Sequence, residues 1–281
     1  MDKLAAKIRP VIQLTKGQPV SDGAGVRMTR MIGTPQLRTL DPFLMLDFFF
    51  SDAASDYQAG FPNHPHRGFE TVTYMLAGRM RHKDNHGHEG VIESGGIQWM
   101  TAGRGVIHSE MPEQADGLMK GFQLWVNLPA RLKMTEPAYF EFSGDALPVE
   151  MRDGATVKIL AGKTSLGTTS PVANTHVGAR YFDINLALGA TFREPVPGEN
   201  AAAIVLFEGA ATIAGRELTN PSVAVLGEGD TVQVTAGTGG ARFLFLSGRP
   251  LYEPVAWAGP FVMNNDIQLR QAFADYQAGR F

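Results

Sequence analysis

The chain has 281 residues, of which 44% are hydrophobic, so it can bury a sizeable core and is long enough for two modest domains. It contains no cysteine, which excludes disulfides, thiolate metal ligands and a cysteine nucleophile. The formal net charge of −3 offers no general attraction to phosphate backbones, so we expect no direct nucleic-acid partner.

Charged residues interrupt every apolar run in residues 1–9, a pattern that fits neither a signal peptide nor a membrane span. We therefore expect a cytoplasmic protein without a membrane partner. The densest basic segment comes next, at residues 27–30 and Arg38. We interpret it as a solvated face, with a small anion or partner patch as the alternative.

From about residue 10 to residue 126 the sequence predicts short strands joined by turns, because its 32 glycines and 17 prolines are scattered along the chain. The clearest strand is the β-branched and aromatic run at 71–76, which ends at a turn signal, Ala77-Gly78. Residues 92–100 and 121–126 are further strand candidates.

Residues 128–137 differ in character and predict a short helical linker that ends at Pro137. Strands are expected again from about 157 to 246. The last stretch, 265–278, predicts a helix that ends at Gly279, with an apolar stripe of Ile267, Phe273 and Tyr276. We expect an N-terminal domain over 1–128, a linker over 129–145, and a C-terminal domain with the helix over 146–281.

Two short motifs in the first half carry the chemistry: His64-Pro65-His66 and, 42 residues after His66, His108-Ser109-Glu110. Side chains two residues apart on a strand share a face and lie roughly 7 Å apart, so each pair can point to one side of a sheet. Three imidazoles and one carboxylate suit iron, manganese, nickel, copper or zinc, and a six-coordinate ion would keep two open positions. Six of the seven histidines fall between 64 and 108, which favours a metal site.

The two halves also resemble diverged copies. The tripeptide Thr101-Ala102-Gly103 recurs 134 residues later as Thr235-Ala236-Gly237. This offset carries His108 and Glu110 onto Arg242 and Leu244, and an alignment of Gly78 with Gly209 carries His64 and His66 onto Pro195 and Pro197. We therefore expect one metal per chain, in the first half only.

The stretches 64–74 (HPHRGFETVTY) and 98–112 (QWMTAGRGVIHSEMP) resemble the pirin family. The resemblance continues at 259–264 (GPFVMN) and 271–281 (QAFADYQAGRF), so it spans nearly the whole chain. It implies an all-β bicupin fold, two antiparallel β-barrels face to face, with Fe(II) or another divalent metal in the N-terminal barrel. We expect a monomer.

The resemblance also implies which carboxylate binds the metal. In the wider cupin pattern the ligand follows the His-x-His motif by four residues, which gives Glu70, whereas the pirin pattern gives Glu110. We assign His64, His66, His108 and Glu110 as metal ligands. Glu70 is then a group that orients a histidine, or a polar barrel residue, because Pro65 and Gly68 favour a bulge that resets the strand alternation.

Other candidates are less specific. His82, His86 and His88 lie in a turn-rich segment, interpreted either as a mouth loop that touches substrate or as a solvated hairpin tip. The Gly103-Arg104-Gly105 segment is either an anion cradle or a glycine pair on a strand that passes close to a metal, and His176 receives no role. Possible pocket walls, or ordinary barrel core, are Phe61, Phe69, Trp99 and Met100.

By resemblance the chain is a metal-dependent dioxygenase that opens quercetin or a related flavonol with O2 and releases carbon monoxide. A carboxylate near the metal, for which we assign Glu110, would accept the proton of the substrate's 3-hydroxyl. The alternative is a non-enzymatic iron-binding protein that docks a transcription factor or a metabolic enzyme as its partner.

Overall fold

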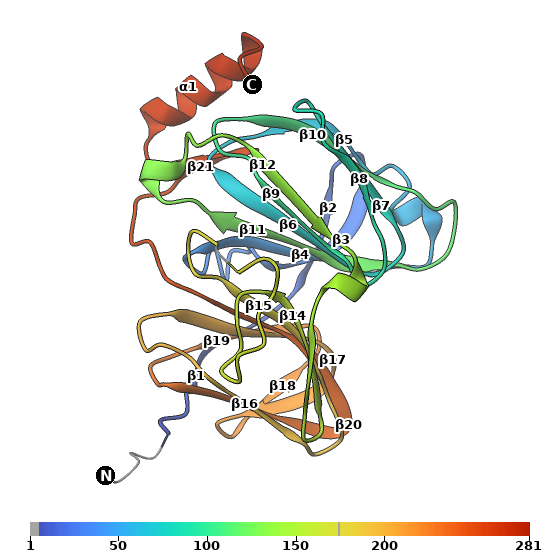
Figure 1. The fold of residues 1–281 in the computed structure, drawn as a ribbon, viewed down its shortest axis with the longest axis vertical. Coiled ribbons are helices and arrows are strands. Elements are labelled where there is room, and N and C mark those ends of the chain that lie inside the picture. Colours follow the sequence, from blue (N-terminus) through green and yellow to red (C-terminus); the bar gives the residue numbers. More distant parts are fainter. Residues whose placement is uncertain (1–5, 174) are drawn as a thin grey trace. The chain divides into compact units, whose positions relative to one another are not determined.

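The computed structural model describes residues 6–173 and 175–281, which form antiparallel strands and one long helix (Figure 1). They divide into two compact units. The histidine unit comprises Gln18–Ala146 and Leu251–Phe281, and the second unit comprises residues 6–17 and the described residues of Leu147–Pro250. The all-β prediction with a C-terminal helix is confirmed.

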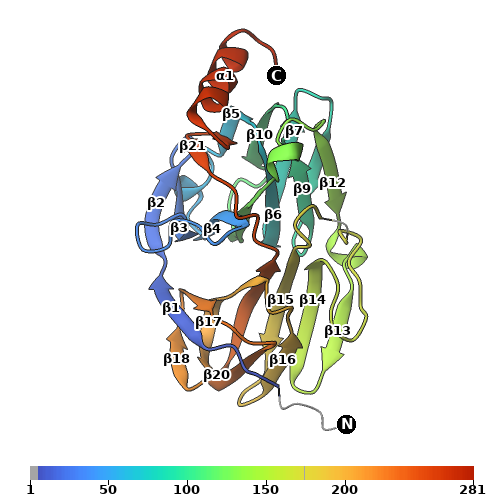
Figure 2. The same ribbon diagram turned by 90° about the vertical axis from the view of Figure 1, so that its left-hand side faces the viewer.

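This division differs from the predicted domain ranges at both ends of the chain. Strand β1 (Val11–Lys16) pairs with β19 (Ser222–Leu226), so the beginning of the chain adds a strand to the second unit. Helix α1 (Asp266–Gln277) lies beside β21 and β22 of the histidine unit (Figure 2). Local sequence patterns carry no information on such long-range pairing.

The histidine unit contains a seven-stranded sheet, a four-stranded sheet and a small hairpin. The seven-stranded sheet has the order β12 (Ala138–Phe142), β9 (Ile97–Thr101), β6 (Phe69–Ala77), β11 (Met119–Asn127), β4 (Phe43–Ser51), β3 (Val26–Ile32) and β2 (Gln18–Asp22). The four-stranded sheet has the order β5 (Phe61–His66), β10 (Val106–Pro112), β7 (Met80–Asp84) and β8 (Glu89–Ile92). The hairpin consists of β21 (Ala256–Ala258) and β22 (Phe261–Met263).

The second unit is one nine-stranded sheet. Its main path runs β1, β19, β17 (Ala201–Ile213), β20 (Thr231–Gly248), β15 (Arg180–Leu186), β14 (Ala155–Ala161) and β13 (Val149–Arg152). Two more strands pair off this path, β16 (Thr191–Pro195) with β20 and β18 (Arg216–Thr219) with β17. The largest members of one apolar cluster in this unit are Phe182, Phe192, Phe243 and Phe245.

Alternation along the four-stranded sheet aims polar side chains inward. Every second residue of β10 is buried, which turns Val106, His108 and Glu110 to the interior. Strand β7 does the same with Met80, His82 and Asp84. The interior of this sheet therefore carries titratable groups where an ordinary sheet would carry only apolar ones.

The segment predicted as one strand over 92–100 is two strands, β8 and β9, separated by a turn at Gly95, whose φ is 84°. The predicted helical linker is a single 3₁₀ turn, Ala130–Leu132, and β12 begins directly after Pro137. None of the helices in the described part of the chain has the length and hydropathy needed to span a bilayer.

Helix α1 begins at Asn265, whose side chain accepts a hydrogen bond from the Gln268 N–H at 3.0 Å. Phe273 and Tyr276 pack against the Phe261 ring, as the predicted apolar stripe requires, and Gly279 follows the helix with a φ of 67°. The assignment of Ile267 to that stripe is wrong, because its side chain is 73% exposed.

Candidate metal centre

Strands β5 and β10 bring the two histidine motifs together. In this antiparallel pair His64 lies opposite His108, and His66 lies opposite Val106. The register shifts between His108 and Glu110, so the strand is irregular beside the cluster. The predicted histidines from both motifs therefore meet at one place.

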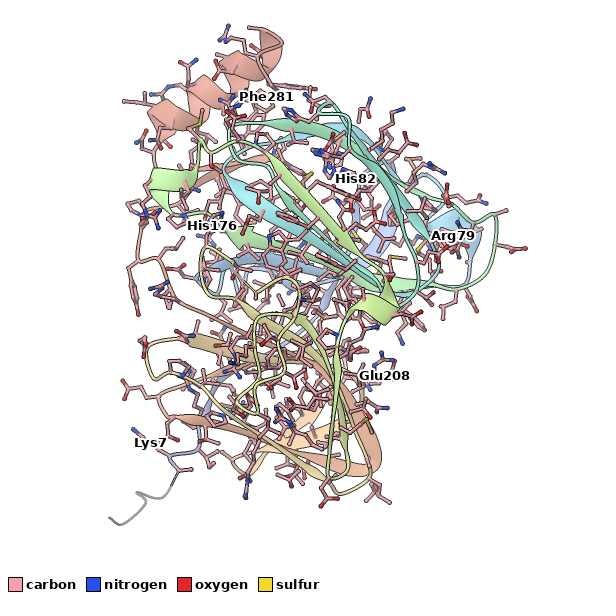
Figure 3. All side chains as sticks on the ribbon, viewed as in Figure 1. Lys7, Arg79, His82, His176, Glu208 and Phe281 are labelled. Carbon is pink, nitrogen blue, oxygen red and sulfur yellow. The ribbon has the colours of Figure 1, made fainter. Side chains whose placement is uncertain are left out.

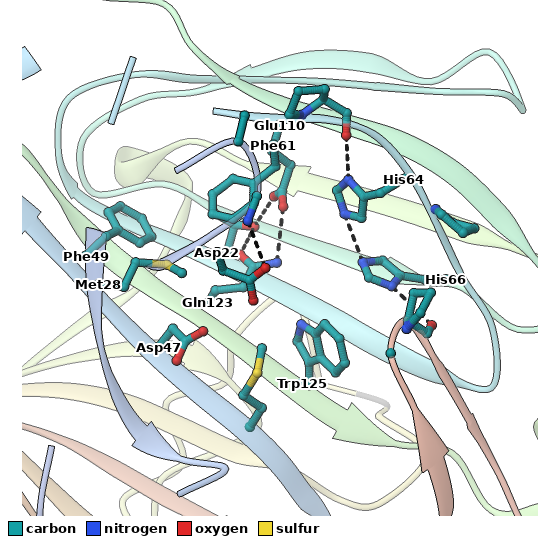
Figure 4. Close-up of a pocket in the computed structure, with 18 of the residues that line it drawn as sticks. Asp22, Met28, Asp47, Phe49, Phe61, His64, His66, Glu110, Gln123 and Trp125 are labelled. Carbon is teal, nitrogen blue, oxygen red and sulfur yellow. Dashed lines mark hydrogen bonds between the residues drawn. The ribbon is translucent and has the colours of Figure 1, made fainter. Parts of the chain in front are cut away.

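His64, His66 and His108 each offer a ring nitrogen, and these three atoms lie within 4.8 Å of one another. The Nε2 atoms of His64 and His66 are only 3.1 Å apart (Figure 4). His66 and His108 are buried and His64 is partly exposed. Close packing of three imidazoles in this way favours a shared cation.

The second nitrogen of each ring has a partner that fixes the ring. His64 Nδ1 donates to the Pro62 carbonyl at 2.8 Å, and His66 Nδ1 donates to the Pro260 carbonyl at 3.3 Å. Both rings therefore keep the Nε2 lone pair for a metal. His108 Nε2 is buried and has no hydrogen-bond partner among the described residues, which is the state expected of a ligand atom facing a cation site.

Burial also sets the charge of these rings. It lowers the pKa of His64, and it lowers the pKa of His66 and His108 well below the ordinary histidine value. The three rings are therefore neutral at physiological pH. Neutral imidazole is the form that binds metal ions, so the residues present fit a divalent metal.

Glu110 lines the same cavity but is not part of the three-histidine cluster. Its Oε1 accepts a hydrogen bond from Thr73 Oγ1 at 2.7 Å, and its Oε2 accepts one from Gln123 Nε2 at 3.3 Å. Burial raises the pKa of Glu110 to about 7, although the Thr73 hydrogen bond opposes this shift. Neither Thr73 nor Gln123 carries a sequence signal, since each lies mid-strand in an ordinary strand pattern.

Glu70 occupies a different environment. Gly68, with a φ of 89°, lies between β5 and β6, so residues 64–70 do not form one unbroken strand. A Cβ at Gly68 would lie 2.0 Å from the Val262 carbonyl oxygen, so only glycine fits there. Glu70 is buried, accepts a hydrogen bond from Thr101 Oγ1 at 2.7 Å, and does not line the cavity.

A cavity of about 680 Å³ opens beside the histidines (Figure 4). Its apolar walls are Met28, Met45, Phe49, Phe61, Trp125 and Trp257. A polar patch on the wall contains Arg30, whose guanidinium donates to both oxygens of the Asp47 carboxylate at 2.8 and 2.7 Å. Arg30 therefore belongs to a partly buried ion pair, which corrects its interpretation as part of a solvated face.

Only Phe61 of the four predicted wall residues lines this cavity. Phe69 is fully buried and packs against the Trp125 ring at 4.3 Å. Trp99 and Met100 are buried on β9. These three residues are ordinary core, which was the alternative that the sequence left open.

The three histidines of the turn-rich segment, His82, His86 and His88, have different surroundings. His82 lies on β7 with no exposed surface, so its interpretation as a hairpin-tip residue is wrong. Its Nδ1 atom lies 3.4 Å from Nδ1 of His108. His86 Nε2 lies 3.0 Å from the Gly105 carbonyl oxygen, and His88 Nδ1 lies 2.8 Å from an Asp84 oxygen. His82 belongs to the histidine unit and His176 to the second unit, and both are labelled in Figure 3.

Other parts of the chain pack closely against Gly103 and Gly105, which explains the glycines of the Gly103-Arg104-Gly105 segment. A Cβ at Gly103 would lie 2.1 Å from the Thr135 carbonyl oxygen, and one at Gly105 would lie 2.7 Å from the Phe281 ring. Arg104 pairs with Glu136 at 2.9 Å. The glycines therefore serve packing.

The second unit has no counterpart of the cluster among its described residues. Of the positions that the repeat alignment carries onto the ligands, Arg242 forms an ion pair with Asp183 at 2.7 Å and Leu244 is a buried core residue. The expectation of a single metal per chain stays a prediction.

Comparisons with known proteins agree over nearly the full length of the chain. The Pirin family profile matches residues 25–126, and a profile described as Pirin C-terminal cupin domain matches residues 181–281. A Pirin-like protein of Caulobacter vibrioides is 59% identical over 98% of this chain and 99% of its own length.

Solved structures show the same fold. A quercetin 2,3-dioxygenase from Acinetobacter baumannii superposes with a TM-score of 0.89 at 33% identity and covers 98% of both chains. The bacterial pirin YhhW from Escherichia coli, solved in complex with nickel(II), gives a TM-score of 0.67 at 18% identity, over 85% of this chain and 99% of its own. The predicted bicupin fold is confirmed, and this chain belongs to the pirin family.

Proposed function

We propose that this chain is a metal-dependent dioxygenase of the pirin type that cleaves quercetin or a related flavonol with O2. The observation that carries the proposal is a cluster of three neutral histidines, with their Nε2 atoms free for a metal, at an apolar cavity of about 680 Å³. A cavity of this size is typical of small-molecule sites. The likeness to a quercetin 2,3-dioxygenase at 33% identity supports the substrate class.

His64, His66 and His108 would hold the metal through Nε2, and we propose the Glu110 carboxylate as the fourth ligand. Once bound, a divalent metal, with iron(II) as our first choice, would supply Lewis-acid assistance and redox chemistry toward oxygen. Manganese, nickel, copper and zinc fit the same donor set.

Glu110 would also accept the proton of the substrate's 3-hydroxyl. Burial raises its pKa to about 7 in the metal-free site, and a bound cation would lower it, which favours the carboxylate form that can act as a base. Thr73 and Gln123 hold the carboxylate in place through hydrogen bonds of 2.7 and 3.3 Å. A carboxylate has two oxygens, so one can bind the metal while the other accepts the proton.

The apolar walls would position the flat flavonol and exclude water. Trp125 and Trp257 present aromatic rings 5.7 Å apart, and Phe61 lies next to His64 with ring centroids 6.5 Å apart. Aromatic rings of this kind pack well against a planar aromatic substrate. The deprotonated flavonol would then react with O2, with ring opening and loss of carbon monoxide.

Anaerobic addition of quercetin to the iron-loaded protein tests the binding step, and admission of oxygen tests turnover. We expect the flavonol absorption band to shift on binding and then to disappear as oxygen is consumed. A flavone that lacks the 3-hydroxyl should bind poorly and remain intact. The His64→Ala/His66→Ala double variant should lose both signals, whereas His176→Ala, which removes a histidine of the second unit, should retain both.

A different outcome would favour the non-enzymatic alternative. If the iron-loaded protein shifts the quercetin band but leaves the flavonol intact in air, the cavity binds the ligand without performing the reaction. The dioxygenase proposal would then be replaced by a metal-bearing binding protein.

A further inference from the structure

A set of buried polar side chains leads from His108 through the interior of the histidine unit. It consists of His82 on β7, Gln98 on β9 and Asp84 at the end of β7. His82 and Gln98 are fully buried, and none of the three lines the cavity. Buried polar groups need hydrogen-bond partners, so the arrangement of donors and acceptors can be worked out.

Gln98 determines which nitrogen of His82 accepts. Its Nε2 atom lies 2.9 Å from His82 Nδ1. An amide nitrogen only donates, so His82 Nδ1 is the acceptor and the proton of the neutral ring lies on Nε2. That Nε2 atom is 3.5 Å from Oδ2 of Asp84, so the carboxylate charge favours a proton on Nε2, although the two atoms do not form a hydrogen bond.

Asp84 is itself held in place from three directions. Its Oδ1 accepts hydrogen bonds from the backbone N–H groups of His86 and His88, both at 2.9 Å, and its Oδ2 faces His88 Nδ1 at 2.8 Å. The Tyr139 ring stacks on His82 with centroids 4.7 Å apart. The orientation of the His82 ring is therefore fixed by its surroundings.

His108 faces this fixed acceptor. Its Nδ1 lies 3.4 Å from Nδ1 of His82. Two nitrogens that both lack a proton would repel each other at 3.4 Å, so His108 presents an N–H to His82 Nδ1, shares this acceptor with Gln98, and keeps its lone pair on Nε2. Nε2 is buried and has no hydrogen-bond partner among the described residues, and His108 offers one ring nitrogen to the three-histidine cluster.

We propose that His82 is a positioning residue for the metal ligand His108. Its Nδ1 accepts the His108 Nδ1–H and thereby keeps the His108 Nε2 lone pair aimed at the metal, while Gln98 and Asp84 hold His82 in the required tautomer. The inference rests on the metal site of the proposed function, but it does not depend on the identity of the substrate. Partners of this kind typically change metal affinity 10–100-fold when they are removed.

The test measures zinc(II) affinity by chelator competition in the full-length protein. His82→Phe keeps a ring beside Tyr139 but removes the acceptor, and we expect a 10–100-fold loss of affinity. His82→Gln can offer its amide oxygen to His108 and should recover most of that loss. His86→Ala removes a ring of the same hairpin whose Nε2 lies beside the Gly105 carbonyl, keeps the backbone N–H that holds Asp84, and should bind zinc like the unmodified protein.

Nitrogen-15 NMR of the histidine rings gives a second readout that a purely structural role would not change. In the unmodified zinc-loaded protein the His108 Nδ1 proton should exchange slowly with water, and in His82→Phe it should exchange fast. If His82→Phe does not fold, Gln98→Leu replaces it, with mixed His108 tautomers expected in the metal-free protein.

Equal zinc affinity in His82→Phe and the unmodified protein, with an unchanged His108 spectrum, would overturn the inference and leave the metal site standing. Failure of the unmodified protein to bind zinc or any other divalent metal would overturn both.

Discussion

At the residue scale, the position of each carboxylate separates the two candidate ligands. Glu110 lies in the cavity beside the histidines, whereas Glu70 is bonded to Thr101 and does not line the cavity. We therefore expect Glu110→Gln to weaken metal affinity by more than the 10–100-fold that is typical of an outer partner, and Glu70→Gln to weaken it less. Titration of the two variants with the same metal decides the matter, and a reversed order would assign the ligand to Glu70.

The raised pKa of Glu110 predicts a pH dependence of stability in the metal-free protein. The carboxyl group stays protonated up to about pH 7 in the folded state, while an unfolded glutamate ionises near pH 4.3. Its contribution to stability is therefore complete below about pH 4.3 and is lost as the pH rises through 7, on the order of 3 kcal/mol in all.

Urea unfolding in the presence of a chelator, at pH 5 and pH 8, measures this contribution. The unmodified protein should lose stability relative to Glu110→Gln between the two pH values, because all other groups titrate alike in both proteins. Equal pH dependence in the two proteins would show that Glu110 ionises normally.

The sequence predicted the histidines of the cluster because strand alternation converts an i, i+2 spacing into a shared face. It did not predict His82, because the neighbouring Asp, Asn and Gly residues are typical of a turn, and β7 extends further into that segment than its composition indicates. Pro260, whose carbonyl holds His66, lies 194 residues away in the sequence, and no local pattern reports such a contact.

At the element scale, the C-terminal segment holds the turn that follows His66. The buried Arg67 donates to Asp275 of α1 at 2.7 Å and lies over the Phe281 ring at 4.2 Å. Arg67 and Arg280 both hold the pKa of Asp275 well below its ordinary value. The helix is thus tied directly to the strand that carries two of the histidines.

Asp275→Asn should therefore destabilise the protein by several kcal/mol, because it leaves a buried guanidinium without its carboxylate. Arg280 is the other charged partner of Asp275, and its side chain is more than half exposed. Arg280→Gln should therefore cost less than about 1 kcal/mol of stability. Urea unfolding measures the stability lost in each variant. Equal losses would mean that the buried Arg67–Asp275 pair stabilises the protein no more than the exposed Arg280–Asp275 pair.

Strand composition and turn residues predicted most of the β-strands, because β-branched runs end at glycines with positive φ, as at Gly78. The break between β5 and β6 falls at Gly68, where the sequence has a glycine after a proline-containing strand. The length of β20, 18 residues, was not predicted, because its interruptions by glycine resemble turns.

At the scale of the whole molecule, the histidines are confined to one unit. The described residues of the second unit contain no metal-binding cluster, and the aligned positions Pro195, Pro197, Arg242 and Leu244 offer no ligand set. We expect one metal per chain by elemental analysis, and none in the His64→Ala/His66→Ala variant. A stoichiometry near two would show that the second unit binds metal as well.

The beginning of the chain belongs to the second unit and the C-terminal segment belongs to the histidine unit, and the sequence did not predict this arrangement. The pattern of β1 predicts a strand but not its partner, and the pairing with β19 spans more than 200 residues. Edge strands pair wherever a free edge and a matching apolar face coincide, which is a property of the folded molecule.

Carbon monoxide release per quercetin consumed tests the proposed reaction most directly. The iron-loaded protein, mixed with quercetin and oxygen in a sealed vessel, should release one carbon monoxide for each flavonol and each O2 consumed. The His108→Ala variant should release none. If quercetin is consumed without carbon monoxide, or persists in air with the metal bound, the dioxygenase account is contradicted.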